Sequence, residues 1–543
     1  MSHAPYAAFS MKETPQTEPI PFREDQVRNN AGGYVFSTGP WQAFLRFLIT
    51  GTEGGTYYIA ERPLTVEGAQ NTIRCLQEDP ARAIQLIVDV STNGRAAKND
   101  PALFALALGA SAPDVGTRRM ALAALPKVAR IPTHLFHFLT YAQNQRGWGR
   151  AFKKGVQDWF AHFSPDQLAY EFVKYQARDG WSNRDVLKLA HPKSDNAQVN
   201  AIYKWAVNGE CAKECPEIIQ RFLEAQAQSG ETKIGLAEIC RLIVQHNLTR
   251  EMVPTWCLRY PETWEALLER MPPTALLRNL GNMSKVGLLK PFSDAAKVVC
   301  DKLGDRESLR RGRVHPMAVL IALKTYGSGC GLRGDGKWEP VPSVEDALDE
   351  AFYACFENVV PTGKRLLIAI DMSGSMLGSS FRSWVGQHDR DIAGTKVHPC
   401  EAAAAMALAC AKSERDYYIM GFADQFRSIN ITAKTRLRDA VNATQSRTFG
   451  PTDCALPWTW ALEQKAQIDA CITLTDNETW SGNVHPTQAL QRYRDKTGIA
   501  AKAVAIGLTA INYTILDPKD SGSLNVAGFD AAAPAAISEF VRS

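Results

Sequence analysis

Hydrophobic residues recur with a helical period along the first part of the chain. In residues 150–163 (RAFKKGVQDWFAHF), apolar side chains stand at i, i+4, i+7, i+8 and i+11, which is the spacing of one helix face. Residues 216–227 and 344–359 repeat this pattern. Short polar breaks separate such stretches, and Pro165 has the position typical of a first helical turn. We therefore predict stacked helix pairs, an α-solenoid, over residues 21–360.

The pattern changes near Gly363, where short apolar runs begin. These runs lie at residues 366–370, 417–422, 470–474 and 501–506. Helical stretches alternate with them, at residues 400–412, 455–465 and 487–496. Strands that are apolar on both faces and alternate with helices are typical of a doubly wound parallel sheet. The fold class is thus α + α/β, with a polar tail at 1–20, a helical domain at 21–360 and an α/β domain at 361–543.

The composition is that of a globular chain. It has 543 residues, of which 45% are hydrophobic and 22% charged, and this excludes a disordered or collagen-like protein. The richest apolar stretch, residues 101–112, is too short to span a bilayer. The N-terminal residues show no basic segment followed by an apolar core, so we expect no signal peptide, no membrane partner and a cytoplasmic location. Twelve cysteines form no CxxC pair, which favours buried, reduced thiols.

Side chains with oxygen atoms stand at the ends of the predicted strands in the second domain. The motif D-x-S-x-S, formed by Asp371, Ser373 and Ser375, ends the first strand, Thr452 opens a helix, and Asp476 ends the third apolar run. In an open α/β sheet, ligands bind at the carboxyl ends of the strands. An all-oxygen set of hydroxyls and carboxylates suits Mg²⁺. The ordinary alternative is that these residues serve only as helix caps and turns.

This set of residues resembles the metal-ion-dependent adhesion site (MIDAS) of von Willebrand factor A domains. The resemblance implies that Ser373, Ser375 and Thr452 bind the metal directly, while Asp371 and Asp476 act largely through bound waters. It also implies a sixth coordination position for an acidic group of a partner.

Catalysis by one of the serines would need a positioned histidine base. Neither His398 nor His485 stands in a hydrolase motif, so we predict that the chain is not an enzyme.

Positive charge is concentrated in the helical domain. The net charge is +4, but residues 118–204 contain 14 Lys and Arg against 6 Asp and Glu, a local charge of +8. The same window is rich in aromatic residues and histidines. Cations that neutralise phosphates, together with flat rings that stack on unpaired bases, are what RNA recognition requires. The ordinary alternative is that each aromatic side chain packs in the core and that each charged side chain is simply solvated at the surface.

Longer stretches resemble the Ro ribonucleoprotein (TROVE) family, of the 60 kDa Ro autoantigen type. They include RIPTHLF at 130–136, TALLRNLG at 274–281, GPTDCALP at 450–457 and TDNET at 475–479. The resemblance implies HEAT-like repeats closed into a ring, with the von Willebrand factor A-like domain joining the two ends. It implies binding of small noncoding Y or Y-like RNA on a basic outer surface. It also implies binding of single-stranded 3′ ends of misfolded RNA in a central hole, for RNA quality control or processing.

The resemblance also points to particular RNA contacts. Lys174, Arg178 and His191 fall where the family binds Y RNA. Lys174 and Arg178 are four residues apart, so we expect one helical turn to point both at one phosphate track. Weaker candidates on the same surface are Arg150, Lys153 and Lys154.

One segment departs from the family. Residues 377–397 are longer than in the animal proteins and carry Asp389, Arg390 and Asp391 beside the predicted metal site. This segment would cap the site or recruit a different partner. The alternative to RNA binding is that the chain is a metal-dependent protein-interaction scaffold. Its A-type domain would then bind an acidic residue of a partner. An exoribonuclease or another protein would bind through the metal site. We expect the chain itself to be a monomer.

Overall fold

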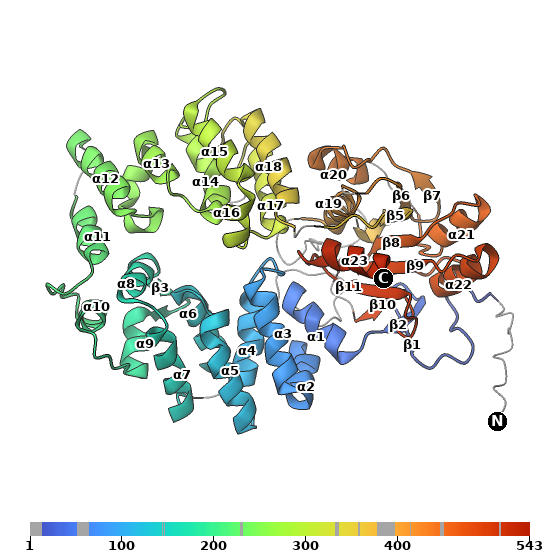
Figure 1. Cartoon of the computed structure of the whole chain (residues 1–543), viewed down its shortest axis with the longest axis horizontal. Coiled ribbons are helices and arrows are strands. Elements are labelled where there is room, and N and C mark those ends of the chain that lie inside the picture. The colour runs from blue at the N-terminus through green and yellow to red at the C-terminus, as the bar shows by residue number, and fades with distance from the viewer. Residues whose placement is uncertain are drawn as a thin grey trace. The chain divides into compact units, whose positions relative to one another are not determined.

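The computed structural model describes residues 13–51, 64–143, 145, 147–228, 232–331, 336–356, 359–376, 397–412, 414–445, 450–509 and 512–543. These residues form two compact units (Figure 1). One unit is helical and spans residues 72–355, while the other combines the chain up to residue 71 with residues 356–543. The segment 377–396, which holds most of the predicted insertion, lies outside the described residues.

The helical unit is a succession of short helices, as the hydrophobic period predicts. Its first half contains α2 (Gln70–Glu78), α3 (Pro80–Thr92), α4 (Asp100–Ser111), α5 (Val115–Val128), α6 (Pro132–Gln143), α7 (Arg150–Ala161), α8 (Pro165–Lys174), the hairpin β3 (Ala177–Arg178) and β4 (Trp181–Ser182), and α9 (Asn183–Ala190). Its second half contains α10 (Ala197–Asn208), α11 (Glu217–Ala227), α12 (Lys233–His246), η2 (Arg250–Met252), η3 (Thr255–Arg259), α13 (Pro261–Leu268), α14 (Pro273–Lys285), α15 (Asp294–Gly304), α16 (Arg306–Arg311), α17 (Pro316–Gly327) and α18 (Pro342–Ala354).

Local sequence explains where these helices begin and what they bury. Pro165 opens α8, and the preceding Ser164 forms a capping box with Gln167. The predicted core face of α7 is confirmed, since Phe152 and Trp159 are buried. Each helix packs on near neighbours in the sequence: α4 contacts α5 and α6, α8 contacts α10 and α11, and α18 contacts α15 and α17. This is the packing expected of a helical solenoid.

The two ends of the helical unit touch. Nε of Arg313, before α17, donates to the carbonyl oxygen of Thr92 at 2.6 Å, and His315 Nε2 lies 2.9 Å from the carbonyl oxygen of Arg95. Gly94 lies between these contacts with a φ of +63°, and a Cβ there would stand 3.2 Å from Arg313 Cβ. The repeats therefore close on themselves through residues of the helical unit.

The other unit is built on a six-stranded sheet with the order β11-β9-β8-β5-β6-β7. Its strands are β5 (Leu366–Asp371), β6 (Tyr417–Phe422), β7 (Phe426–Ser428), β8 (Ala470–Thr475), β9 (Lys502–Gly507) and β11 (Ser523–Ala527). All neighbours pair in parallel except β7, which is antiparallel to β6. The helices are η4 (Gly374–Met376), α19 (Pro399–Ala411), α20 (Leu437–Gln445), α21 (Leu456–Glu463), α22 (Pro486–Thr497) and α23 (Ala533–Arg542). The central strands β5 and β8 are buried at every position, so the predicted doubly wound sheet is confirmed.

The N-terminal segment corrects the predicted domain boundaries. In place of a tail and the start of the helical domain, it forms β1 (Gln26–Arg28), β2 (Tyr34–Ser37), α1 (Pro40–Thr50) and η1 (Glu67–Ala69) in the unit of the parallel sheet. Strand β2 pairs with β10 (Tyr513–Thr514). Gln16 is completely buried and donates to Asp453 Oδ1 at 2.7 Å. These strands are too short to show a period, and their partners lie at the far end of the chain.

Two further observations bear on the class of protein. No helix in the described ranges is long and apolar enough to cross a membrane. All twelve cysteines are free thiols, and although seven are buried, Cys211 and Cys330 are exposed.

Candidate metal centre and RNA surface

The predicted metal ligands lie where β5 ends. Asp371 is completely buried, and both of its carboxylate oxygens are oriented by the protein. The backbone N–H of Ser373 donates to Oδ1 at 2.9 Å, and the hydroxyl of Thr475 donates to Oδ2 at 2.6 Å. The hydroxyl oxygens of Ser373 and Ser375 are 2.9 Å apart. Thr475 ends β8 and is a member of this cluster that the sequence reasoning missed.

The other two candidates are brought to the same edge of the sheet. Thr452 is buried, and its carbonyl oxygen accepts from the backbone N–H of Trp480 at 3.0 Å, which ties its loop to the segment after β8. The next residue, Asp453, donates its N–H to the carbonyl oxygen of Ala423, just beyond β6. Asp476 follows β8 directly and is 2% exposed. The loops that carry all five predicted ligands therefore meet at the carboxyl ends of β5, β6 and β8.

The donor set fits a hard divalent cation. Burial, and next the nearby charge of Asp476, raise the pKa of Asp371 to about 7. A bound cation would remove this repulsion, and carboxylate and hydroxyl oxygens are ligands that Mg²⁺ accepts. Among the described residues, no group of three or more His, Cys, Asp or Glu is arranged to hold a metal. The fit thus rests on two carboxylates completed by hydroxyls.

The loop after β8 also holds the N-terminal segment. The carboxylate of Glu478 accepts from Asn30 Nδ2 at 2.8 Å and from the hydroxyl of Tyr513. Burial, and next the charge of Asp476, raise the pKa of Glu478 to about 7. The carbonyl oxygen of Thr479 accepts from Asn29 Nδ2 at 2.7 Å. These contacts had no signal in the sequence, because they join residues at opposite ends of the chain.

The three principal RNA candidates lie on consecutive elements of the helical unit. Lys174 is the last residue of α8, and its ammonium lies 5.3 Å and 5.2 Å from the ring centres of Tyr170 and Tyr175. Arg178 lies on β3 with its side chain 65% exposed. His191 is exposed and ends α9 in the left-handed region, with a φ of +50°.

The structure corrects one step of the sequence argument. Lys174 and Arg178 do not share a helical turn, because α8 ends at Lys174 and Arg178 belongs to a two-stranded hairpin. The hairpin turn consists of Asp179 and Gly180, with φ values of +52° and +79°. An Asp-Gly pair with positive φ at both positions is typical of a tight hairpin turn, and this dipeptide was the signal that could have revealed it.

The weaker candidates lie on α7. Arg150 is its exposed first residue, and Lys153 is half-buried. Lys154 donates to Asp158 Oδ1 at 2.6 Å, one turn later, so part of its charge is already compensated.

A half-buried histidine lies between α4 and the turn of the hairpin. His137 on α6 places Nδ1 2.7 Å from Asp100 Oδ1 and Nε2 3.0 Å from Asp179 Oδ2 at the hairpin turn. The hydrogen bond with Asp100 raises the pKa of His137, against the opposing effect of burial. Sequence reasoning missed this residue, because it contacts the site only through tertiary structure.

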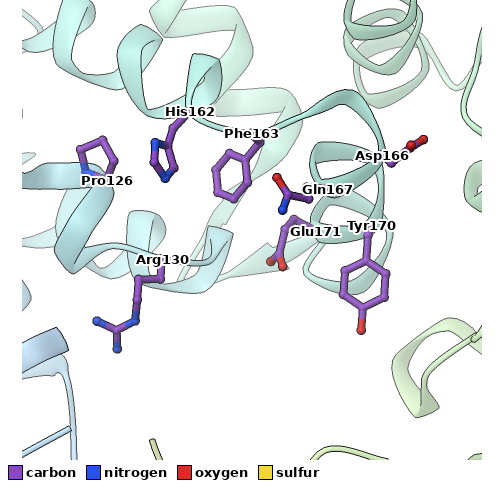
Figure 2. A pocket seen from close by; sticks show the side chains of 8 residues that line it. All are labelled: Pro126, Arg130, His162, Phe163, Asp166, Gln167, Tyr170 and Glu171. Atoms are coloured by element: carbon purple, nitrogen blue, oxygen red, sulfur yellow. The ribbon is translucent and has the colours of Figure 1, made fainter. Parts of the chain in front are cut away.

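A pocket of about 400 Å³ lies beside Lys174 in the same unit (Figure 2). It is formed by the end of α5, the end of α7 and the first turns of α8. Its lining residues are Pro126, Arg130, His162, Phe163, Asp166, Gln167, Tyr170 and Glu171. Tyr170 belongs both to this pocket and to the surroundings of Lys174.

These features define a class of protein: a closed helical-repeat protein that carries a von Willebrand factor A-type domain with a MIDAS-like edge. A model of the TROVE domain matches residues 27–233 and 215–328, and a model of the Ro60 vWA domain matches residues 365–541. The chain therefore belongs to the Ro60 family of TROVE-domain proteins.

Individual relatives agree with this assignment. The chain is 43% identical over 539 residues to the RNA-binding protein RO60 of Deinococcus radiodurans, with 98% of each chain covered. It is 30% identical over 602 residues to the RNA-binding protein RO60 of Caenorhabditis elegans, covering 96% of this chain and 90% of that one. The crystal structure of the D. radiodurans RO (RSR) protein matches with a TM-score of 0.70 and 42% identity, over 93% of this chain and 99% of that one. Both named relatives are RNA-binding proteins, in agreement with the prediction that the chain is not an enzyme.

Proposed function

We propose that the chain is the RNA-binding protein of a Ro-type ribonucleoprotein and that it acts in RNA quality control or processing in the cytoplasm. A small noncoding Y or Y-like RNA would bind at Lys174, Arg178 and His191. The observation that carries this proposal is the grouping of basic side chains and aromatic rings on α8, the hairpin and α9. The RNA-binding names of two relatives that cover nearly the whole chain support it.

The charges on these elements suit a phosphate backbone. Arg178 has one ion pair among the described residues, a 3.6 Å contact with its neighbour Asp179, so most of its five donors are available. Lys174 is half-buried against two tyrosine rings, which restrict its side chain and leave less entropy to be lost on binding. Binding through such contacts weakens steeply with salt, because each neutralised phosphate releases a counterion.

The second RNA ligand in this proposal is the single-stranded 3′ end of a misfolded RNA, taken up by the closed helical repeats. The contact of Arg313 and His315 with residues 92–95 supports it, because closure gives the repeats an inner surface distinct from the outer one. The A-type domain would bind Mg²⁺ at Asp371 and its neighbours. An acidic residue of a protein partner, such as an exoribonuclease, would complete the coordination of the ion.

The experiment compares two triple variants of the full chain. Lys174→Ala/Arg178→Ala/His191→Ala removes the proposed contacts, and Lys297→Ala/Arg306→Ala/Arg311→Ala removes exposed cations elsewhere in the helical unit. RNA that copurifies from the native host at low salt is sequenced, transcribed and titrated against each protein. We expect a loss of about 100-fold in affinity for the first variant and little change for the second.

Equal losses in the two variants would remove the assignment to this surface. Absence of any copurifying RNA would favour the alternative function. In that case a protein retained in Mg²⁺ and released by a chelator would identify the chain as a protein-interaction scaffold.

A further inference from the structure

The pocket beside Lys174 contains an acidic side chain, Glu171. Glu171 is largely buried, and its Oε2 atom has no hydrogen-bond partner among the described residues. Burial raises the pKa of Glu171 to about 7, and the charge of Lys174 acts in the opposite direction. Native proteins rarely leave a buried acceptor without a donor. Glu171 therefore favours a ligand that brings a donor into the pocket.

The rest of the lining suits a flat, aromatic ligand. Phe163 and Tyr170 supply ring faces or edges, and His162 adds a third ring at the margin. Figure 2 shows the carboxyl group of Glu171 and the guanidinium of Arg130 extending toward the same open side of the pocket. Arg130 is held by hydrogen bonds to the hydroxyl and carbonyl oxygens of Ser91 at 2.7 Å and 3.1 Å. Its planar group is thus a rigid wall on which a ring can stack.

The pocket shares Tyr170 with the proposed phosphate contact. Glu171 and Lys174 are three residues apart on α8, and Tyr170 contacts the ammonium of Lys174 and also lines the pocket. A nucleotide whose phosphate lies on Lys174 has its base within reach of this wall. An unpaired base is commonly recognised in this way, by stacking on aromatic side chains and by hydrogen bonds to its Watson–Crick edge.

We propose that this pocket accepts one unpaired RNA base and that Glu171 selects bases that carry an exocyclic amino group. The amino group of cytosine, adenine or guanine donates to the carboxylate of Glu171, which lines the pocket, as acidic side chains accept from cytosine N4 elsewhere. Uracil presents carbonyl oxygens at the corresponding positions; these repel the carboxylate and flank the single Watson–Crick donor of uracil, its N3–H. The proposal rests on the proposed function, since it requires RNA to be the ligand.

The test uses two labelled decamers, C10 and U10, which differ at each base chiefly in the 4-amino or 4-oxo group. Their affinities for the full chain are measured by fluorescence anisotropy at low salt and at about pH 8.5, above the raised pKa of Glu171, so that its carboxyl group is ionised. We expect C10 to bind about tenfold more tightly than U10, the effect of one charge-assisted hydrogen bond. In Glu171→Gln the ratio falls to about one, because the amide donates and accepts and no longer rejects uracil.

Two controls make the outcome decisive. Asp166→Asn removes an exposed carboxylate that also lines the pocket, and we expect it to keep the preference for C10. Thermal melting of Glu171→Gln should match that of the native chain, since no internal partner of Oε2 is lost. Equal binding of C10 and U10 by the native chain, or an unchanged ratio in Glu171→Gln, would overturn the pocket assignment alone. Failure of both decamers to bind, with the copurifying RNA still bound, would overturn the pocket assignment and leave the contacts at Lys174, Arg178 and His191 standing.

Discussion

Replacing His137 by Gln tests whether a charged histidine holds the hairpin that carries Arg178. The imidazole is 18% exposed and lies 2.7 Å from Asp100 and 3.0 Å from Asp179. A net hydrogen bond between charged groups contributes about 1.5–3 kcal/mol, and the more exposed Asp179 contact contributes about 0–1 kcal/mol. We therefore expect the variant to lose about 2 kcal/mol, which corresponds to a fall of about 4–6 °C in the Tm of a unit of this size.

The sign of the pH dependence follows from the charges around His137. The hydrogen bond with Asp100 raises its pKa, burial lowers it, and the charges of Asp100 and Asp179 outweigh that of Arg178. The two other titratable groups beside Asp100 are His134, whose pKa burial lowers to about 3, and Tyr141, whose pKa lies above its usual range. Since the folded-state pKa of His137 is raised, its contribution is complete below the unfolded value of 6.5 and is lost as the pH rises through the folded value.

The assay is thermal unfolding of the native chain and of His137→Gln at about pH 6 and about pH 9, followed by circular dichroism. We expect the difference in Tm to be largest at the lower pH and to shrink at the higher one. His162→Gln, an exposed histidine of the same unit, serves as the control and should show no such change. A difference that is equal at the two pH values, or absent at both, would show that His137 does not act as a cation between the carboxylates.

Three further changes probe other parts of the protein. Asp371→Ala should abolish the rise in Tm that Mg²⁺ causes. It should leave the affinity for RNA within about twofold of the native value, since the two sites lie in separate units. A large loss of RNA affinity in a folded variant would contradict this. Gly94→Ala should lower the free energy of unfolding in urea by about 1–2 kcal/mol, because φ is +63° and the new Cβ would stand 3.2 Å from Arg313 Cβ. An unchanged midpoint would show that the contact between Gly94 and Arg313 adjusts without cost. Gln16→Ala should cost about 1–3 kcal/mol in the same assay, by leaving buried Asp453 without its side-chain donor, whereas full stability would mean that residues near 16 do not pack as described.

The strong periodic signals predicted the right architecture. Strands β5 and β8 are buried on both faces, so they appear as continuous apolar runs that end in Asp371 and Asp476. The carboxyl ends of adjacent parallel strands meet by topology, and this is why the grouping of Asp371 and Asp476 could be predicted from the sequence alone. The helical face of residues 150–163 was equally direct, because Trp159 and its neighbours repeat at the helical period.

Features that depend on contacts between distant segments could not be predicted in this way. The four-residue spacing of Lys174 and Arg178 suggested a helix, yet the turn at Asp179 and Gly180 overrides it. His137 and Glu171 owe their surroundings to the packing of several helices, and neither stands in a recognisable motif. Their chemistry comes from burial and from neighbours, which a single sequence does not show.

The N-terminal segment shows how far such contacts alter the functional unit. Val35 belongs to the same buried core as Leu367 of the central strand. Asn29 and Asn30 donate to the loop that begins at Asp476, so one short loop supports the metal edge and anchors the N-terminal segment. A fragment that starts at residue 361 would leave those acceptors without their donors and would expose this core. The A-type unit is therefore discontinuous in sequence, and its metal edge depends on residues that precede the helical repeats.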